Sequence, residues 1–130
     1  MSNMPGRAWV EINLDNIVNN LNEIRKHLGP DTKINGVIKA DGYGHGAVMT
    51  GKVLSESGID MLSVATLDEA IQLRKESITI PILVLGYIDV GRLQEIVEND
   101  ITVSVFDLDI ARNMSDEAKV KGEKLNVHLK

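Results

Sequence analysis

The sequence predicts an α/β protein built on a parallel β-sheet. Short apolar segments recur about every 20–25 residues, and an amphipathic segment of helical period separates each pair. A helix between two strands returns the chain to the start of the next strand, which favours right-handed βαβ connections. Two architectures have this order, a doubly wound open sheet and a (β/α)8 barrel. The chain has 130 residues, about half of the roughly 250 in a complete barrel, so length alone favours a five-stranded open sheet.

The first two predicted elements are a strand and a helix. Residues 8–13 (AWVEIN) alternate apolar and polar side chains with the period of a strand. Asp15 is a candidate N-cap for a helix over about 16–28. One face of that helix carries four apolar residues, Ile17, Leu21, Ile24 and Leu28. Gly29 and Pro30 follow, and this pair is typical of a helix end.

The remaining strands and helices alternate along the chain. Residues 34–39 form a continuous apolar strand, typical of a parallel strand buried on both faces. Further strands are predicted at 61–65, 82–86, 101–106 and 125–130, with helices at 47–57, 66–75, 89–98 and 107–121. Candidate N-caps are Thr66 or Asp68 and Asp107, and candidate helix ends are Gly58 and Gly122.

Composition excludes several classes of function. The formal net charge is −5 and the basic residues are scattered, which argues against a nucleic-acid-binding groove. The absence of cysteine excludes disulfides, zinc–thiolate sites and thiol catalysis. No apolar run approaches the ~20 residues that span a bilayer, and the first residues lack the apolar segment of a signal peptide. We therefore expect a soluble cytoplasmic protein without a membrane or nucleic-acid partner.

The stretch KADGYGHG, from Lys39 to Gly46, is the feature most indicative of chemistry. In both architectures ligands bind at the carboxyl ends of the parallel strands, and Lys39 lies at such an end. Apolar neighbours favour the neutral amine that Schiff-base chemistry requires. Three glycines in five residues permit positive φ and close approach of the backbone to a ligand. Spacing alone leaves open that Lys39 is a solvated residue and the glycine loop only a turn.

The run VIKADGYGHG resembles the pyridoxal-phosphate (PLP) lysine motif of the alanine racemase family. The match runs through Val37, Ile38, Lys39, a three-residue linker and the YGHG stretch from Tyr43 to Gly46. Other segments are similar to family elements in the same order. RAWVEINLDNIVNNL resembles the first strand and helix, SVATLDEAIQLR the second strand and helix, IPILVLG the third strand, and VHLK the segment before a D-T-G-M-G-R element.

The resemblance implies a barrel instead of an open sheet. The family has an N-terminal (β/α)8 barrel that carries PLP, followed by a C-terminal β-domain, and it works as a homodimer. Residues 1–13 would be an N-terminal strand that associates with the missing β-domain. Residues 14–130 would be a partial PLP-binding barrel domain, so the expected fold class is α/β, the first half of a TIM-type barrel with parallel strands.

The resemblance also implies an activity, the PLP-dependent interconversion of L-alanine and D-alanine for peptidoglycan precursors. Lys39 would hold the cofactor and act as one base, and Tyr43 would hydrogen-bond the PLP phosphate. Val37, Leu83 and Leu85 would lie near the cofactor ring, although plain barrel core explains them equally well. Lys130 matches a lysine that is carbamylated in many members, and no metal is implied. The second base would be a tyrosine from the partner's C-terminal domain, so we expect this chain alone to be inactive.

Three alternatives remain open at this point. Serine racemases of vancomycin-resistance type and broad-specificity racemases share the lysine motif, and the residues that set substrate choice lie mostly beyond position 130. A non-catalytic PLP-binding barrel module is the second alternative, although the lysine of such proteins is not followed by GYGHG. The third is a small open-sheet protein without a cofactor, in which Lys39 is merely exposed.

Overall fold

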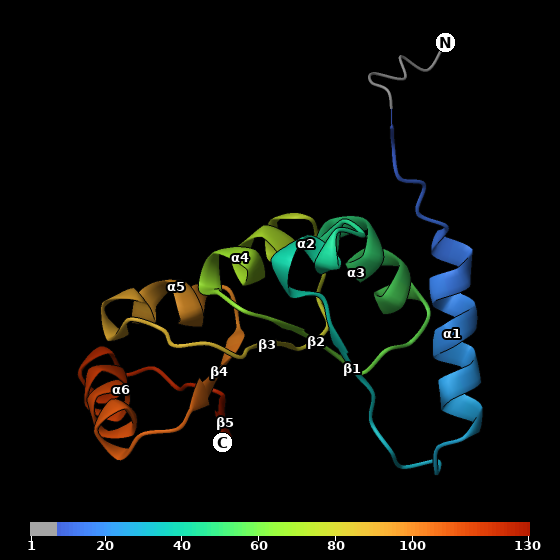
Figure 1. Cartoon of the computed structure of the whole chain (residues 1–130). Helices are drawn as coiled ribbons and strands as arrows, with labels where there is room; N and C mark the ends of the chain where they lie inside the picture. The colour runs from blue at the N-terminus through green and yellow to red at the C-terminus, as the bar shows by residue number, and fades with distance from the viewer. Residues whose placement is uncertain (1–7) are drawn as a thin grey trace.

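The computed structural model describes residues 8–130, which form one parallel sheet with helices along one side (Figure 1). The strands are β1 (Asn35–Val37), β2 (Met61–Val64), β3 (Ile82–Val84), β4 (Ile101–Val105) and β5 (Val127–Leu129). They lie in the order β1-β2-β3-β4-β5, and every neighbouring pair is parallel. A doubly wound sheet reverses its strand order at a switch point, and this sheet does not. The strand order therefore confirms the predicted α/β fold with strands arranged as in a barrel.

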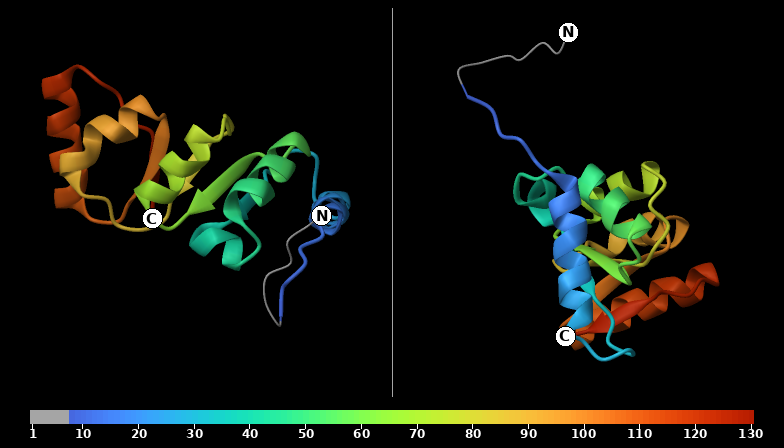
Figure 2. Two further views of the ribbon diagram at one scale, coloured as in Figure 1. Left: turned by 90° about the horizontal axis from the view of Figure 1, so that it is seen from above. Right: turned by 90° about the vertical axis from the view of Figure 1, so that its right-hand side faces the viewer.

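The helices are α1 (Leu14–Lys26), α2 (Lys39–Tyr43), α3 (Ala47–Glu56), α4 (Leu67–Lys75), α5 (Leu93–Glu98), which follows the 3-10 turn η1 (Val90–Arg92), and α6 (Leu108–Lys121). They form an arc around the strands, from α1 on the right of Figure 1 to α6 on the left. Seen from above, the helices follow the strand order (Figure 2). The predicted caps at Thr66, Asp107 and Gly122 are confirmed, because the first two side chains accept helix amides and Gly122 is left-handed.

The hydrophobic core lies between these helices and the face of the sheet that they cover. The strands contribute Leu62, Val64, Ile82, Val84, Ile101 and Val103, and the helices contribute Leu54, Leu67, Ala70, Leu73, Ile96 and Met114. Gly36 lies on the same face, since an added Cβ would come within 2.7 Å of Ile59 Cδ1. Because side chains alternate along a strand, Val37 faces the opposite side, away from the helices.

One arginine ties together the chain segments at the amino ends of β1 and β2. Arg25 of α1 donates to Asp60 Oδ2 at 3.1 Å from both terminal nitrogens and to the carbonyl oxygen of Gly58 at 2.8 Å. The backbone amide of Ile34 donates to the same carboxylate at 2.7 Å. The Ile34 amide and, after it, the Arg25 guanidinium lower the pKa of Asp60 below its usual value.

A second arginine ties together the chain segments at the amino ends of β3 and β4. Arg74 of α4 donates to four backbone carbonyl oxygens at distances of 2.7 to 2.9 Å. The acceptors precede β3 (Ile78 and Ile80) and β4 (Asn99 and Asp100). One planar guanidinium thus holds two loops to one helix, which a single-point ammonium group would not do.

The N-terminal segment differs from its prediction. Residues 8–13 form no strand and run away from the sheet (Figure 1). A strand exists only where a neighbouring backbone completes its hydrogen bonds, and the sheet begins at β1. The family resemblance extends the N-terminal strand segment to residues 1–13, and residues 1–7 of it lie outside the described residues. Its association with a β-domain stays a prediction. Helix α1 also begins earlier than predicted, because Asn13 and not Asp15 is the N-cap, accepting from the Asn16 amide at 3.2 Å.

The burial of β1 differs as well. Asn35 and Val37 are exposed, although the sequence predicted a strand buried on both faces. Helices cover only one face of the sheet, so the other face of an edge strand stays open. Of the predicted apolar face of α1, only Leu21 is fully buried, while Ile24 and Leu28 are exposed. None of the helices within residues 8–130 has the length and apolar character needed to cross a bilayer.

Candidate functional site

A left-handed turn begins directly after β1, with Lys39 as its first residue. Residues 40–44 all have positive φ, including three that are not glycine, Ala40 (51°), Asp41 (52°) and Tyr43 (55°). The expectation of positive φ at the glycines of this loop is confirmed, but its extension to other residues was not foreseen. A left-handed conformation costs an L-residue about 1–2 kcal/mol. Backbone strain of this kind concentrates at functional sites.

Hydrogen bonds hold the backbone on both sides of Lys39. The Ile38 amide donates to the carbonyl oxygen of Ser63 at 2.9 Å, as a continuation of the β1–β2 pairing. The Ala40 amide donates to Glu69 Oε1 of α4 at 2.7 Å. Lys39 itself is half-buried, and none of the ion pairs among residues 8–130 involves it. The lysine is therefore fixed at its backbone while its amine stays free of a charged partner in the described part of the chain.

The turn is also tied to the helix that follows it. Asp41 Oδ1 accepts from the Ala47 amide, the first residue of α3, at 2.8 Å, and the Asp41 carbonyl accepts from Gly46 at 2.9 Å. His45 Nδ1 lies 3.0 Å from the Gly42 carbonyl oxygen, so it donates locally within the turn.

The predicted ring-contact residues lie on the face of the sheet opposite the helices. Val37 pairs with Ser63, and Ser63 pairs with Leu83, so Val37 and Leu83 share one row across β1, β2 and β3. Leu85 lies two residues beyond Leu83, nearer the carboxyl edge where Lys39 lies. Val37 is 41% exposed and Leu85 is half-buried, whereas Leu83 is only 2% exposed. Val37 and Leu85 therefore offer surface to a ligand, and Leu83 is packed within the sheet.

Tyr43 and Lys130 are the other two predicted site residues. Tyr43 is 59% exposed on the turn, so its hydroxyl can reach a ligand. Lys130 follows β5, and its amide donates to the Val105 carbonyl oxygen at 3.0 Å, while its side chain is exposed. Because β1 and β5 are opposite edges of the sheet, the structure does not bring Lys130 beside Lys39.

Sequence reasoning missed Glu69. Its carboxylate accepts the Ala65 amide at 2.7 Å, the Thr66 amide at 3.2 Å and the Ala40 amide at 2.7 Å. The capping box with Thr66 is visible in the sequence as T-x-x-E before a helix. The contact with Ala40 joins residues 29 positions apart, and no local pattern reports it.

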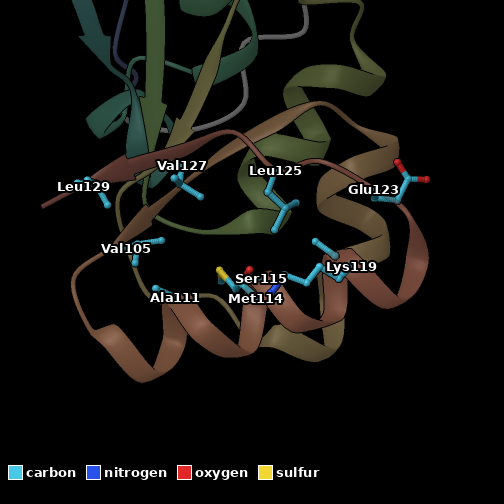
Figure 3. Close-up of a pocket in the computed structure, with 10 residues that line it drawn as sticks. Val105, Ala111, Met114, Ser115, Lys119, Glu123, Leu125, Val127 and Leu129 are labelled. Carbon is cyan, nitrogen blue, oxygen red and sulfur yellow. The ribbon is translucent and has the colours of Figure 1, made fainter.

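An apolar hollow of about 300 Å³ lies elsewhere, between α6 and the strands β4 and β5 (Figure 3). Its walls include Val105, Met114, Ala118, Leu125, Val127 and Leu129. These side chains belong to the helix-covered side of the sheet, and they include none of the predicted site residues. We therefore place the candidate site at the Lys39 turn and not at this hollow.

Comparison with known proteins identifies the family that the chain resembles. The family described as "Alanine racemase, N-terminal domain" matches residues 12–130. Alanine racemase 2 of Caldanaerobacter subterraneus subsp. tengcongensis is 46% identical over 121 residues, which are 93% of this chain and 31% of that protein. The alanine racemase of Clostridium difficile 630 has a TM-score of 0.89 at 46% identity, over 96% of this chain and 33% of that chain. A histidine racemase from Leuconostoc mesenteroides subsp. sake NBRC 102480 has a TM-score of 0.79 at 27% identity, over 88% of this chain and 30% of that chain. The chain spans about a third of the length of the curated relatives that it matches.

Proposed function

We propose, because this chain belongs to the alanine racemase family, that it supplies the cofactor-binding part of a PLP-dependent racemase that interconverts L-alanine and D-alanine. The observation that carries the proposal is the position of Lys39. It lies at the carboxyl end of a parallel strand, the edge where barrels of this class bind their ligands, and on a strained turn that hydrogen bonds hold in place.

The side chains at this edge include the types of chemical group that could bind PLP. The Lys39 amine can bind the aldehyde carbon of the cofactor, and the exposed Tyr43 hydroxyl can donate to its phosphate. Val37 and Leu85 offer apolar surface to an aromatic ring. When bound, PLP supplies an electron sink that makes the α-hydrogen of an amino acid acidic. The protein supplies the position of the substrate and the groups that exchange its proton.

Racemisation removes a proton from one face of the α-carbon and returns a proton to the other face. We assign the proton exchange on one face to the Lys39 amine, which would act as general base once the amino group of the substrate has replaced it at the cofactor. One side chain does not reach both faces, so a second acid–base group is required. The resemblance to the family assigns that group to a tyrosine in the C-terminal domain of a second subunit. The proposal therefore includes a cytoplasmic homodimer that provides D-alanine for peptidoglycan.

A racemase for another amino acid is the second candidate. Its support is the structural likeness to a histidine racemase, which shares this part of the fold at 27% identity. A lysine motif and a strand arrangement specify the cofactor chemistry but not the pocket for the substrate side chain. Serine or broad specificity is the form of this candidate that the lysine motif also accommodates.

The test of the proposal is whether PLP attaches to Lys39. We expect the purified chain with added PLP to show a visible absorption band, and expect borohydride to remove the band and leave a permanent adduct on Lys39 that mass analysis locates. Lys39→Ala should abolish both signals. The matched control Lys52→Ala, which removes a lysine paired with Glu76 at 2.7 Å, should change neither. Absence of any adduct on Lys39 in the wild-type chain would refute the cofactor role. Rates of racemisation of alanine and serine by a longer protein that contains this segment then separate the two candidates.

A further inference from the structure

In the Lys39 turn, residues 39–44, the backbone amide of Ala40 has its hydrogen-bond acceptor outside the turn. In any helical turn the first amides point away from the turn and need an outside acceptor. In this left-handed turn the acceptor for Ala40 is Glu69 Oε1 of α4, at 2.7 Å. The peptide group that follows Lys39 is thus held by a carboxylate from the next βα unit.

The other oxygen of the same carboxylate is committed to β2 and α4. Glu69 Oε2 accepts the Ala65 amide at 2.7 Å and the Thr66 amide at 3.2 Å. Those two amides lie directly after β2, so one side chain joins the carboxyl ends of β1 and β2. A helix cap needs only the Thr66 contact. The Ala40 contact is additional, and it reaches the one turn in this edge that carries the candidate cofactor lysine.

Both peptide groups that flank the Lys39 α-carbon are hydrogen-bonded. The Ile38 carbonyl oxygen accepts the Gly42 amide at 2.9 Å within the turn, and the Ala40 amide donates to Glu69 Oε1 at 2.7 Å. With both peptide planes held, the direction of the Lys39 Cα–Cβ bond is set before any ligand arrives. A displacement of about 1 Å in a reacting group can cost on the order of a hundredfold in rate.

We propose that Glu69 is a positioning residue for Lys39: by accepting the Ala40 amide it holds the left-handed turn and directs the Lys39 amine toward the aldehyde of PLP. The inference rests on the proposed function, because it assumes that Lys39 reacts with the cofactor. It assigns to Glu69 no contact with the substrate and no proton transfer.

The variants Glu69→Gln and Thr66→Ala separate positioning from helix capping. Glu69→Gln keeps the size of the side chain but replaces one acceptor oxygen by an NH₂ group, so it cannot accept at both ends. Thr66→Ala removes the hydroxyl that accepts the Glu69 amide at 3.3 Å, while the Glu69 carboxylate can still hold Ala40. Both variants weaken the cap of α4, and only Glu69→Gln disturbs the turn.

Two measurements read out the effect, the hydrogen-exchange rate of the Ala40 amide without cofactor and the rate of PLP attachment to Lys39 at limiting PLP. For Glu69→Gln we expect exchange at Ala40 to accelerate and PLP attachment to slow by at least about tenfold. The induced circular dichroism of the bound cofactor should also change, since it depends on how the cofactor is oriented. For Thr66→Ala we expect both rates within about twofold of the wild type, since the capping contact does not reach Lys39. If Glu69→Gln does not fold, Glu69→Asp, which keeps the charge but is one methylene shorter, gives the same comparison.

The outcomes distinguish this inference from the proposed function. If PLP attaches to Lys39 equally fast in the wild type and in Glu69→Gln, the positioning role is wrong and the proposed function stands, whatever the exchange rate at Ala40. An equal slowing in Thr66→Ala and Glu69→Gln would also overturn it, because helix capping would then explain the effect. A wild-type chain that forms no adduct on Lys39 overturns the proposed function and this inference together.

Discussion

Replacing Arg74 by methionine should destabilise the fold strongly. The substitution keeps an unbranched apolar stem and removes four hydrogen bonds to backbone carbonyl oxygens before β3 and β4. Net contributions near 1 kcal/mol per bond, reduced because the freed carbonyls partly regain water, predict a loss of about 3 kcal/mol. With a urea dependence of about 1.5–2 kcal/mol per molar, the unfolding midpoint should fall by about 1.5–2 M.

The matched control is Arg112→Met. Arg112 makes a single exposed ion pair with Asp109 at 3.2 Å, three residues away on the same helix. Exposed pairs of this kind contribute little, so its midpoint should shift by less than about 0.3 M. Urea titrations followed by far-ultraviolet circular dichroism measure both variants. Equal midpoints for the two variants would show that the four carbonyl contacts of Arg74 do not stabilise the fold, and the reasoning would fail.

Three further predictions concern the backbone and pH. Changing Ser77, which follows α4 with φ of 65°, to Gly should raise the free energy of unfolding by about 0.5–1 kcal/mol, as measured in thermal melts. Ser57→Gly, at φ of −89°, should lower it. A rise in both variants would contradict the strain argument. Gly86→Ala should destabilise by about 2 kcal/mol, because its Cβ would lie 2.5 Å from a carbonyl oxygen at the end of the neighbouring strand. Gly29→Ala, whose nearest contact would be at 3.7 Å, should be near neutral, and similar melting temperatures for these two variants would refute the packing argument. Because the pKa of Asp60 is lowered in the folded state by its backbone and guanidinium hydrogen bonds, its contribution is present above the unfolded value of 3.8 and is lost as pH falls through the lower folded value. The urea midpoint should therefore fall less steeply between pH 7 and pH 2 in Asp60→Asn than in the wild type. Parallel pH profiles of the two proteins would contradict a stabilising role of the Asp60 carboxylate.

The sequence predicted most strands and helices of the fold because these elements carry a local signal. Apolar runs marked the strands, and side-chain caps at Thr66 and Asp107 marked helix starts within one residue. Length favoured an open sheet, and only the family resemblance favoured the barrel order that the structure has. The direction in which a chain of βα units winds is a global property, so no single segment reports it.

The positive φ of the glycines in the Lys39 turn was predictable, but the full geometry of the turn was not. The glycines after Lys39 predicted positive φ at their own positions. Ala40 and Asp41 also have positive φ, because contacts from α4 and α3 hold them in the left-handed conformation. Those contacts connect positions that are distant in sequence. The predicted strand at residues 8–13 failed for the complementary reason, since alternation is local and strand formation needs a partner.

The two arginines and the lysine turn lie at opposite ends of the same strands. Arg25 and Arg74 hold the loops that enter the strands, and Lys39 lies where β1 exits. Selection for heat resistance and selection for a new substrate would therefore act on separate sets of positions. A protein engineer can stabilise the loops that precede the strands and then vary the loops that follow them, and the two sets of substitutions should interfere little with each other.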